Sequence, residues 1–279
     1  MIDRRRFALF AAAGLLGPAL AQRARAQMAL PAGSARAAVT EPLHDMSVWP
    51  ADWMGDEQVV MLAYPGMTAL DLAGPQYMFG SLAGATVQVA SKTLDPIRSD
   101  TGLTILPDIT LAEAHEAPDI LFVPGAISGL LNAMEDAETV DFVAARGERA
   151  RYVTAVCTGS LLLGQAGLLD GYKATSHWLA MDSLDAFGAE AVDDRVVRDR
   201  NRITGGGVTA GLDFGLTVLE ELRGTDYAQA VQLLAEYAPE PPLAAGTLAG
   251  APADVAEMMV NMFPGFDAHV RAVAATRRG

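Results

Sequence analysis

Hydrophobic residues in this chain gather in short continuous runs, separated by longer stretches in which apolar and polar positions mix. Three of these runs end at turns of small residues, and they lie at 59–64, 120–123 and 152–156. Such runs are typical of strands that are buried on both faces of a parallel sheet. Helical composition is found at 68–82, 135–148, 161–169 and 209–222. The alternation predicts an α/β fold, with an open, doubly wound, mostly parallel sheet sandwiched by helices.

Shorter elements complete this prediction. Residues 86–90 are expected to form a further strand, and hairpins are expected over 95–108 and over 195–204. The α/β domain is assigned to residues 58–238. Residues 239–279 are assigned to a Pro-rich C-terminal extension with one short helix at 254–262, which packs either on the domain or on a partner subunit.

The first 57 residues are predicted to lie outside the domain. Three arginines, Arg4 to Arg6, precede an apolar stretch, and Ala24-Arg25-Ala26 supplies a small-residue cleavage site. The paired arginines before Phe7 resemble a twin-arginine export signal. A signal peptide over 1–26, a linker or N-terminal arm over 27–57 and a periplasmic location are therefore expected, with an uncleaved membrane anchor as the alternative.

The net charge of the chain excludes some classes of binding partner. Its 279 residues include 34 acidic and 20 basic ones, for a net charge of −14. Such an acidic surface repels phosphate backbones and anionic lipid, so we expect no nucleic-acid binding and no stable membrane association after signal cleavage. The four histidines lack metal-ligand spacing, and neither a metal nor a cofactor is predicted. The single cysteine permits no intramolecular disulfide.

The predicted sheet brings three residues to one edge. Asp71, Gly125 and Cys157 each follow the carboxyl end of a predicted buried strand, and ligands of open α/β sheets bind outside those ends. Cys157 leads into a helix, whose N-terminus favours the thiolate and lowers the pKa of the thiol. It is therefore a candidate nucleophile, although a lone cysteine is often only a small core residue.

The residues around this candidate nucleophile allow more than one role. Thr158 either caps the helix or donates a hydrogen bond to substrate. Gly159 and Ser160 leave the backbone free to make the turn and offer N–H groups to an anionic intermediate. Asp71 lies between two leucines, so it is either a general acid with a raised pKa or a carboxylate stabilised by the helix dipole.

A histidine and a glycine-rich stretch are two further candidates for parts of a site. His177 is either a base for Cys157 or a structural histidine near a strand end. The stretch from Gly205 to Ala210 superficially fits a dinucleotide fingerprint, but it comes late in the chain and is interpreted as a tight turn that opens a helix.

Several segments resemble the ThiJ/PfpI superfamily, and within it the isonitrile hydratases (cyclohexyl-isocyanide hydratases). The resemblance rests on the CTGS turn within YVTAVCTGSLLLGQAGLLDGYKATSHW, on YPGMTALDLAGP, and on RVVRDRNRITGGGVTAGLDF and LLAEYAPEPP. These segments occur in this order between residues 58 and 242. The CTGS turn together with DLAGP is fairly specific, whereas either alone would be weak.

The resemblance implies a flavodoxin-like fold of the class I glutamine amidotransferase type, usually a homodimer, acting on a small-molecule substrate. It places the nucleophile at Cys157, the acid at Asp71, the adjacent threonine at Thr158, and a backbone N–H facing the cysteine at Gly125. The implied reaction adds water to an isonitrile and gives an N-substituted formamide. In it the Cys157 thiolate attacks the terminal carbon while Asp71 protonates that carbon, and Asp71 then activates water.

Departures from the family pattern keep other functions open. The family has Pro-Gly-Gly where this chain has Pro124-Gly125-Ala126, and an export signal is not expected of a cytoplasmic hydratase. Thr158 stands where the protease-like relatives have histidine, which argues against peptidase activity. The alternatives are glyoxalase-like chemistry on an α-oxoaldehyde and reversible oxidation of Cys157 in a sensing domain. The acidic, Pro-rich segment after Leu222 does not suit a DNA-binding module.

Overall fold

The computed structural model of the protein describes residues 46–276. The predicted signal peptide and most of the predicted linker lie outside the described residues and stay predictions. The chain divides into two units after Trp49, and the second unit holds the α/β domain. Two short 3-10 helices come first, η2 (Met46–Val48) and η3 (Ala51–Trp53). Within 46–276, no helix is long and apolar enough to cross a membrane.

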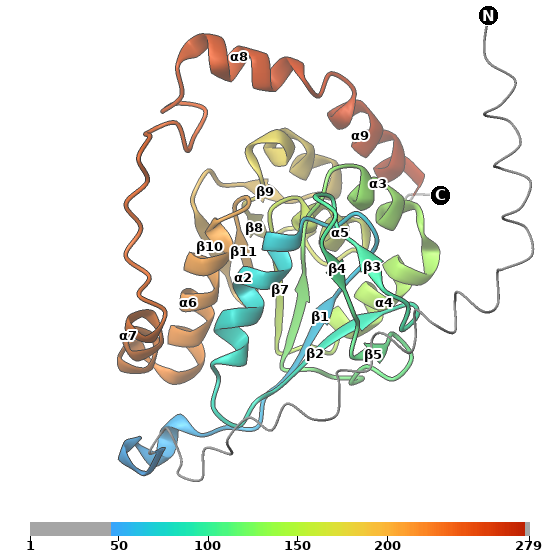
Figure 1. Ribbon diagram of the computed structural model, residues 1–279. Coiled ribbons are helices and arrows are strands. Elements are labelled where there is room, and N and C mark those ends of the chain that lie inside the picture. The colour runs from blue at the N-terminus through green and yellow to red at the C-terminus, as the bar shows by residue number, and fades with distance from the viewer. Residues whose placement is uncertain (1–45, 277–279) are drawn as a thin grey trace, which may run out of the picture. The chain divides into compact units, whose positions relative to one another are not determined.

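The centre of the domain is a seven-stranded sheet in the order β10-β11-β7-β6-β1-β2-β5 (Figure 1). In chain order these strands are β1 (Gln58–Leu62), β2 (Thr86–Ser91), β5 (Ile109–Thr110), β6 (Ile120–Val123), β7 (Tyr152–Val156), β10 (Val196–Asp199) and β11 (Arg202–Gly205). The three predicted buried runs are β1, β6 and β7, which pair in parallel at the centre. The edge pair β10–β11 is antiparallel and the other pairs of this sheet are parallel. The predicted flavodoxin-like, mostly parallel α/β fold is confirmed.

Helices α2 (Ala69–Gly80) and α6 (Ala210–Arg223) pack together on the sheet (Figure 1). Their aromatic side chains meet one from a central strand, because Phe79, Phe122 and Phe214 lie with ring centroids 5.7 to 6.1 Å apart. A second group of helices consists of α3 (Ser128–Glu135), α4 (Ala137–Gly147) and α5 (Gly159–Gln165). Every residue of α5 is buried, so this short helix is held entirely by its surroundings.

Several elements were not predicted from the sequence. They are α3, α7 (Thr225–Leu234), α9 (Phe266–Thr276), the 3-10 helix η4 (Trp178–Phe187), the edge strand β5, and the short pair β8 (Lys173–Ala174) and β9 (Glu190–Ala191). Helix α9 follows α8 (Ala253–Asn261), so the C-terminal extension holds two helices where one was expected. Pro264-Gly265 separates them, and α9 buries one apolar face at helical spacing against η4 and α3. The small hairpin predicted over 95–108 is present as β3 (Ile97–Arg98) and β4 (Thr104–Ile105).

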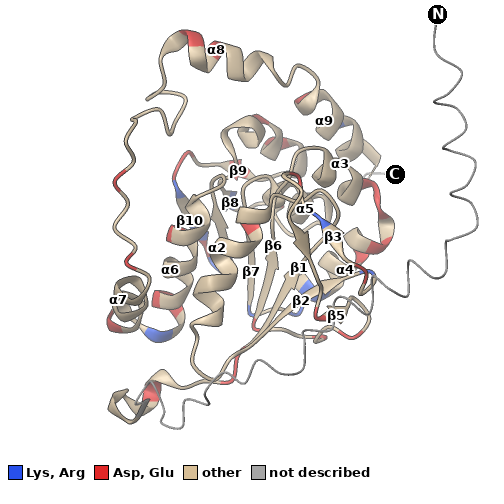
Figure 2. Ribbon diagram, viewed as in Figure 1, with Lys and Arg blue, Asp and Glu red and all other residues tan. Residues whose placement is uncertain are grey.

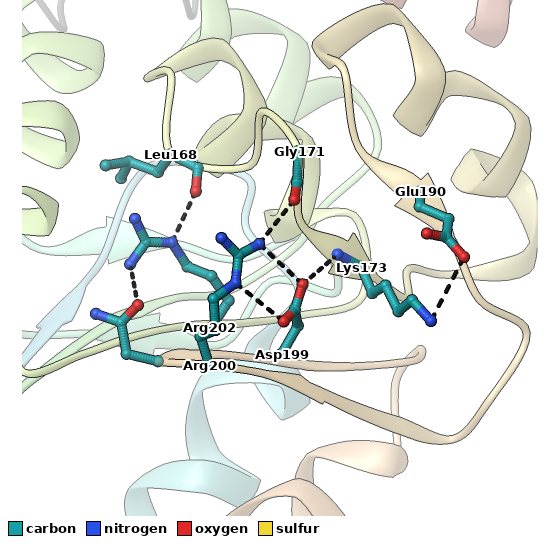
Figure 3. A network of polar contacts seen from close by, with 8 residues as sticks. Leu168, Gly171, Lys173, Glu190, Asp199, Arg200 and Arg202 are labelled. Carbon is teal, nitrogen blue, oxygen red and sulfur yellow. Dashed lines mark hydrogen bonds and ion pairs between the residues drawn. The ribbon is translucent and has the colours of Figure 1, made fainter.

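The β10–β11 hairpin is anchored to its surroundings by a charged network (Figure 3). Arg200, at the turn, has a φ of 55° and donates hydrogen bonds to Asp199 and to the Gly171 carbonyl. Its guanidinium lies 3.5 Å from the centroid of the Tyr172 ring, and the buried Arg202 donates to the Leu168 carbonyl. These contacts fix the start of β11, whose other end reaches the candidate site.

Candidate active site

Cys157 occupies a tight turn between β7 and α5. Its φ is 57°, a left-handed conformation that costs a non-glycine residue about 1–3 kcal/mol unless its surroundings impose it. Hydrogen bonds to both the N–H and the carbonyl of Cys157 hold it in this conformation. Its N–H donates to the carbonyls of Gly205 and Gly206, both at 3.0 Å, and its carbonyl accepts the hydroxyls of Ser176 (3.0 Å) and Ser160 (3.3 Å). The turn therefore holds the thiol at the carboxyl edge of the sheet.

Asp71 lies in the first turn of α2 and is fully buried. Its Oδ2 accepts the N–H of Gly125 at 3.1 Å, and the carboxyl is hydrogen-bonded to the Cys157 thiol. Its Oδ1 is also buried and has no hydrogen-bond partner among the described residues. An unpaired buried acceptor is costly, so the site has an oxygen that a bound proton, a water or a substrate can satisfy.

Gly125, at the end of β6, forms the third side of the site. A methyl group on its Cα would lie 2.7 Å from the Cys157 Cβ and from the Thr158 nitrogen, and 2.8 Å from Asp71 Oδ2. The Cys157 side chain, the Asp71 carboxyl and the Thr158 N–H thus surround one point, and only glycine leaves room there. The Gly125 N–H was expected to face the cysteine, but it donates to Asp71 instead, so it positions the acid.

Thr158 has a role that the sequence did not indicate. Its buried hydroxyl accepts the Ala126 N–H at 2.9 Å and donates to the Ala126 carbonyl at 2.5 Å, and it makes no cap to α5. The side chain therefore does not cap the helix, contrary to one of the two expectations, and the expected hydrogen bond from Thr158 to a substrate stays a prediction. It clamps the turn after β6 beside the cysteine, where both the backbone and the side chain of Thr158 act to lower the pKa of the thiol, against the larger effect of burial.

Gly159 allows the close packing that brings these turns together. A Cβ at this position would lie 2.4 Å from the Val123 carbonyl oxygen and 2.8 Å from that of Pro124. The start of α5 therefore rests directly on the end of β6. The expected role of Gly159 in offering N–H groups to an anionic intermediate stays a prediction.

The electrostatics of the site favour neutral groups. Burial raises the pKa of Asp71 from 3.8 to about 7, against the lowering effect of its hydrogen bonds with Cys157 and Gly125. Burial, and then the Asp71 carboxylate, raise the pKa of Cys157 well above its ordinary value. The raised pKa expected for an acid among leucines is found at Asp71. The expectation that the helix N-terminus lowers the pKa of Cys157 is wrong, because desolvation outweighs the short α5.

His177 is structural in its contacts. Its Nδ1 accepts the N–H of Leu179 at 3.2 Å, which caps η4, and burial lowers its pKa. A Cβ on Gly207 would lie 2.1 Å from the His177 ring, so the glycine turn that opens α6 makes room for the histidine. The groups that act on the charge of Cys157 are Asp71 and Thr158. Among the described residues, no group of three His, Cys, Asp or Glu could hold a metal ion.

Sequence reasoning missed the side-chain contacts of three residues that hold the site. Ser160 and Ser176 bind the Cys157 carbonyl, and Tyr64 donates its hydroxyl to the Pro124 carbonyl at 2.8 Å. Burial, then Asp71 and Cys157, raise the pKa of Tyr64, which keeps this hydroxyl a donor. Ser160 stands inside the CTGS turn and Tyr64 directly before the first Pro-Gly turn, and these positions were the available signals. Ser176 had none, because it reaches the turn from a separate loop.

Comparison with known proteins agrees with this geometry. The sequence pattern of the DJ-1/PfpI family matches residues 57–221. The chain is 48% identical over 200 residues to an isonitrile hydratase of Pseudomonas putida, which covers 72% of this chain and 87% of that protein. It is 52% identical to a ThiJ/PfpI family protein of Pseudomonas syringae, whose crystal structure superposes with a TM-score of 0.79 over 86% of this chain and 98% of that one.

A more distant solved structure shares the same core. DJ-1beta of Drosophila melanogaster is 25% identical and superposes with a TM-score of 0.60, covering 66% of this chain and all of that one. The residues that match the family, 57–221, include the central strands β1, β6 and β7 and the Cys157 turn. This chain belongs to the DJ-1/PfpI family.

Proposed function

We propose that this protein is a cysteine-dependent hydratase that adds water to an isonitrile and releases an N-substituted formamide. One observation carries the proposal: the Cys157 side chain, the Asp71 carboxyl and the Thr158 N–H surround the single point that Gly125 leaves open. The similarity to an isonitrile hydratase along most of both chains supports the choice of substrate class. A terminal isonitrile carbon is small enough to enter a site whose cysteine is only 5% exposed.

In the first half of the reaction the elements of the thiol add to the isonitrile carbon. The sulfur lone pair forms the S–C bond, and the lone pair of the terminal carbon takes a proton from Asp71. The thiol proton passes to the Asp71 carboxyl, which therefore ends this half in the state in which it began. The product is a thioimidate, R–N=CH–S–Cys157. Because Cys157 is a neutral thiol in the resting site and Asp71 has a pKa of about 7, the carboxyl suits this transfer.

In the second half, Asp71 gives its proton to the thioimidate nitrogen and, as a carboxylate, takes a proton from water while the hydroxide adds to the thioimidate carbon. This leaves a tetrahedral carbon that bears sulfur, a hydroxyl group and an N–H group. Collapse of this carbon to the formamide expels the thiolate, which takes up the proton that the hydroxyl group loses. The unpaired Asp71 Oδ1 is the acceptor available to that water, and the Thr158 N–H lies beside the departing sulfur.

The test is turnover of cyclohexyl isocyanide to N-cyclohexylformamide, with mass spectrometry of the protein during turnover. Cys157→Ala and Asp71→Asn are expected to lose at least about 100-fold in kcat. Asp141→Asn, an exposed position on α4, should keep wild-type turnover. A covalent adduct of the isonitrile mass should appear at Cys157 in wild type. Wild-type turnover by either site variant would refute the scheme.

Methylglyoxal, assayed beside the isonitrile, separates this proposal from glyoxalase-like chemistry on the same cysteine. The sensing alternative needs a thiolate that peroxide oxidises readily. The raised pKa of Cys157 opposes that alternative, because it leaves little thiolate at neutral pH. Fast peroxide oxidation without turnover of either electrophile would reverse this preference.

A further inference from the structure

A cavity lies between helix α9 and the group of helices formed by α3, α4 and α5 (Figure 1). Its volume is about 550 Å³, within the range of about 300–1,000 Å³ that is usual for sites of small organic molecules. No residue that forms the candidate active site lines it. Its apolar wall includes Met134 on α3, Val140 on α4 and Val273 on α9. The cavity is therefore a separate space with the size of a ligand site.

Gln165, the last residue of α5, brings an unpaired polar group to the wall of this cavity. The residue is 7% exposed, and its Oε1 is buried and has no hydrogen-bond partner among the described residues. An unpaired buried acceptor destabilises a folded chain, and leucine or methionine would fill a similar space without that penalty. A ligand that donates a hydrogen bond to Oε1 removes the penalty. The amide therefore points to a ligand with an N–H or O–H group.

The charge around the cavity is negative. The end of α3 and the start of α4 carry acidic residues and neither lysine nor arginine (Figure 2). Lys92 pairs with two of these acids, Asp136 and Glu138, and none of the three lines the cavity. Glu135 does line it, and its Oε1 lies 2.8 Å from Nε2 of His269. Because acidic side chains line the cavity and no lysine or arginine does, it favours a cation and repels an anion.

We propose that this cavity binds an organic ammonium ion, in which a protonated primary amine carries an apolar substituent. An ammonium group has three N–H donors and no acceptor, so it can donate both to Gln165 Oε1 and to the Glu135 carboxylate. The substituent then lies against the apolar wall. A neutral alcohol of the same length would satisfy the amide oxygen and leave the carboxylate without a counter-charge. A carboxylate ligand would satisfy neither group.

The cavity and the Cys157 turn lie at opposite ends of helix α5. This helix begins at Gly159, two residues after Cys157, and ends at Gln165. An ammonium ion at Gln165 would therefore use neither the thiol nor the Asp71 carboxyl. The inference is independent of the proposed function, and its test needs no isonitrile.

NMR titration of the full chain at neutral pH with three probes of equal length tests the proposal. The probes are hexylammonium, hexan-1-ol and hexanoate. Hexylammonium is expected to bind at least about tenfold more tightly than hexan-1-ol, because only the cation forms charge-assisted hydrogen bonds with the carboxylate. Hexanoate should not bind. Equal affinity for hexylammonium and hexan-1-ol, or no saturable binding of hexylammonium, would overturn the proposal.

Matched variants assign the binding to this cavity. Gln165→Leu and Glu135→Gln should each weaken hexylammonium binding by at least about fivefold. Gln76→Leu and Glu257→Gln, at exposed positions on α2 and α8, are the controls and should bind as wild type does. The midpoint of urea unfolding of Gln165→Leu should equal or exceed that of wild type, because the substitution removes an unpaired polar group. Wild-type affinity in either site variant, an equal loss in the controls, or a lowered midpoint in Gln165→Leu would overturn the proposal.

Discussion

The buried acid makes a quantitative prediction about stability. In the folded protein the pKa of Asp71 is about 7, against an ordinary value of 3.8. Between these two pH values the folded chain keeps a proton on Asp71 that the unfolded chain has released. Because the unfolded state then binds fewer protons, the free energy of unfolding falls as pH rises. Substitution Asp71→Asn removes this group and its titration.

The magnitude follows from the size of the shift. Each pKa unit is worth about 1.4 kcal/mol, so the stability of wild type relative to Asp71→Asn should decline by about 1.4 kcal/mol for each pH unit in this window. The whole window, from about pH 4 to about pH 7, amounts to about 4 kcal/mol. Above it the difference between the two proteins becomes constant until Cys157 titrates, since the pKa of that thiol is raised well above its ordinary value.

Urea unfolding at several pH values from 4.5 to 8.5, followed by tryptophan fluorescence, measures this difference. Titrations that do not respond to Asp71 are common to the two proteins and cancel when their free energies are subtracted, and Cys157 and Tyr64, whose pKa values Asp71 raises, titrate above the window from about pH 4 to about pH 7. Asp141→Asn is the control for a carboxyl that lies on the surface of α4. A wild-type-minus-variant difference that stays flat, or that rises with pH, would refute the assignment of a protonated Asp71 at neutral pH.

Three further predictions concern the turns around the cysteine. Gly125→Ala should lower turnover by at least about 100-fold, because its methyl group would displace the side chains of Cys157 and Asp71. Gly246→Ala is the control and should keep wild-type turnover, because a Cβ at position 246 meets open space. Thr158→Val should lower the free energy of unfolding by about 1–3 kcal/mol, measured by denaturant titration, because it leaves the backbone N–H and C=O of Ala126 without their partner. Thr158→Ser should recover most of that loss. Alkylation of Cys157 by iodoacetamide should be slow at pH 8 and should accelerate in Asp71→Asn, where the carboxylate no longer raises the pKa of the thiol; an unchanged rate would contradict the coupling.

The fold was predictable where the apolar pattern is strong. The runs that became β1, β6 and β7 are continuous and end at small-residue turns, and their parallel pairing follows from the intervening helices. Helix α7 was missed because only Gly224 separates it from α6, and helices α3 and α9 were missed because each begins within three residues after a Pro-Gly pair. The edge strand β5 has two residues, too few to carry a period.

The sequence predicted which residues form the candidate site better than it predicted what each residue does there. The ends of parallel strands must meet, so Asp71, Gly125 and Cys157 could be placed together from the sequence. The hydrogen-bond partners of these groups could not be predicted, because the partners of the Gly125 N–H and of the Thr158 hydroxyl depend on how the turns fold against one another. The direction of the Cys157 pKa depends on burial, which is a property of the packed structure and left no trace in the local sequence.

The clamp between Thr158 and Ala126 bears on how freely this turn can vary. The two hydrogen bonds use the backbone N–H and C=O of residue 126, and the Ala126 side chain takes no part in them. The methyl group that distinguishes this chain from a Pro-Gly-Gly turn is accommodated in the core, where Ala126 is 1% exposed. Position 126 can therefore exchange small residues without moving the groups around Gly125, whereas the adjacent position 125 has no room for any side chain.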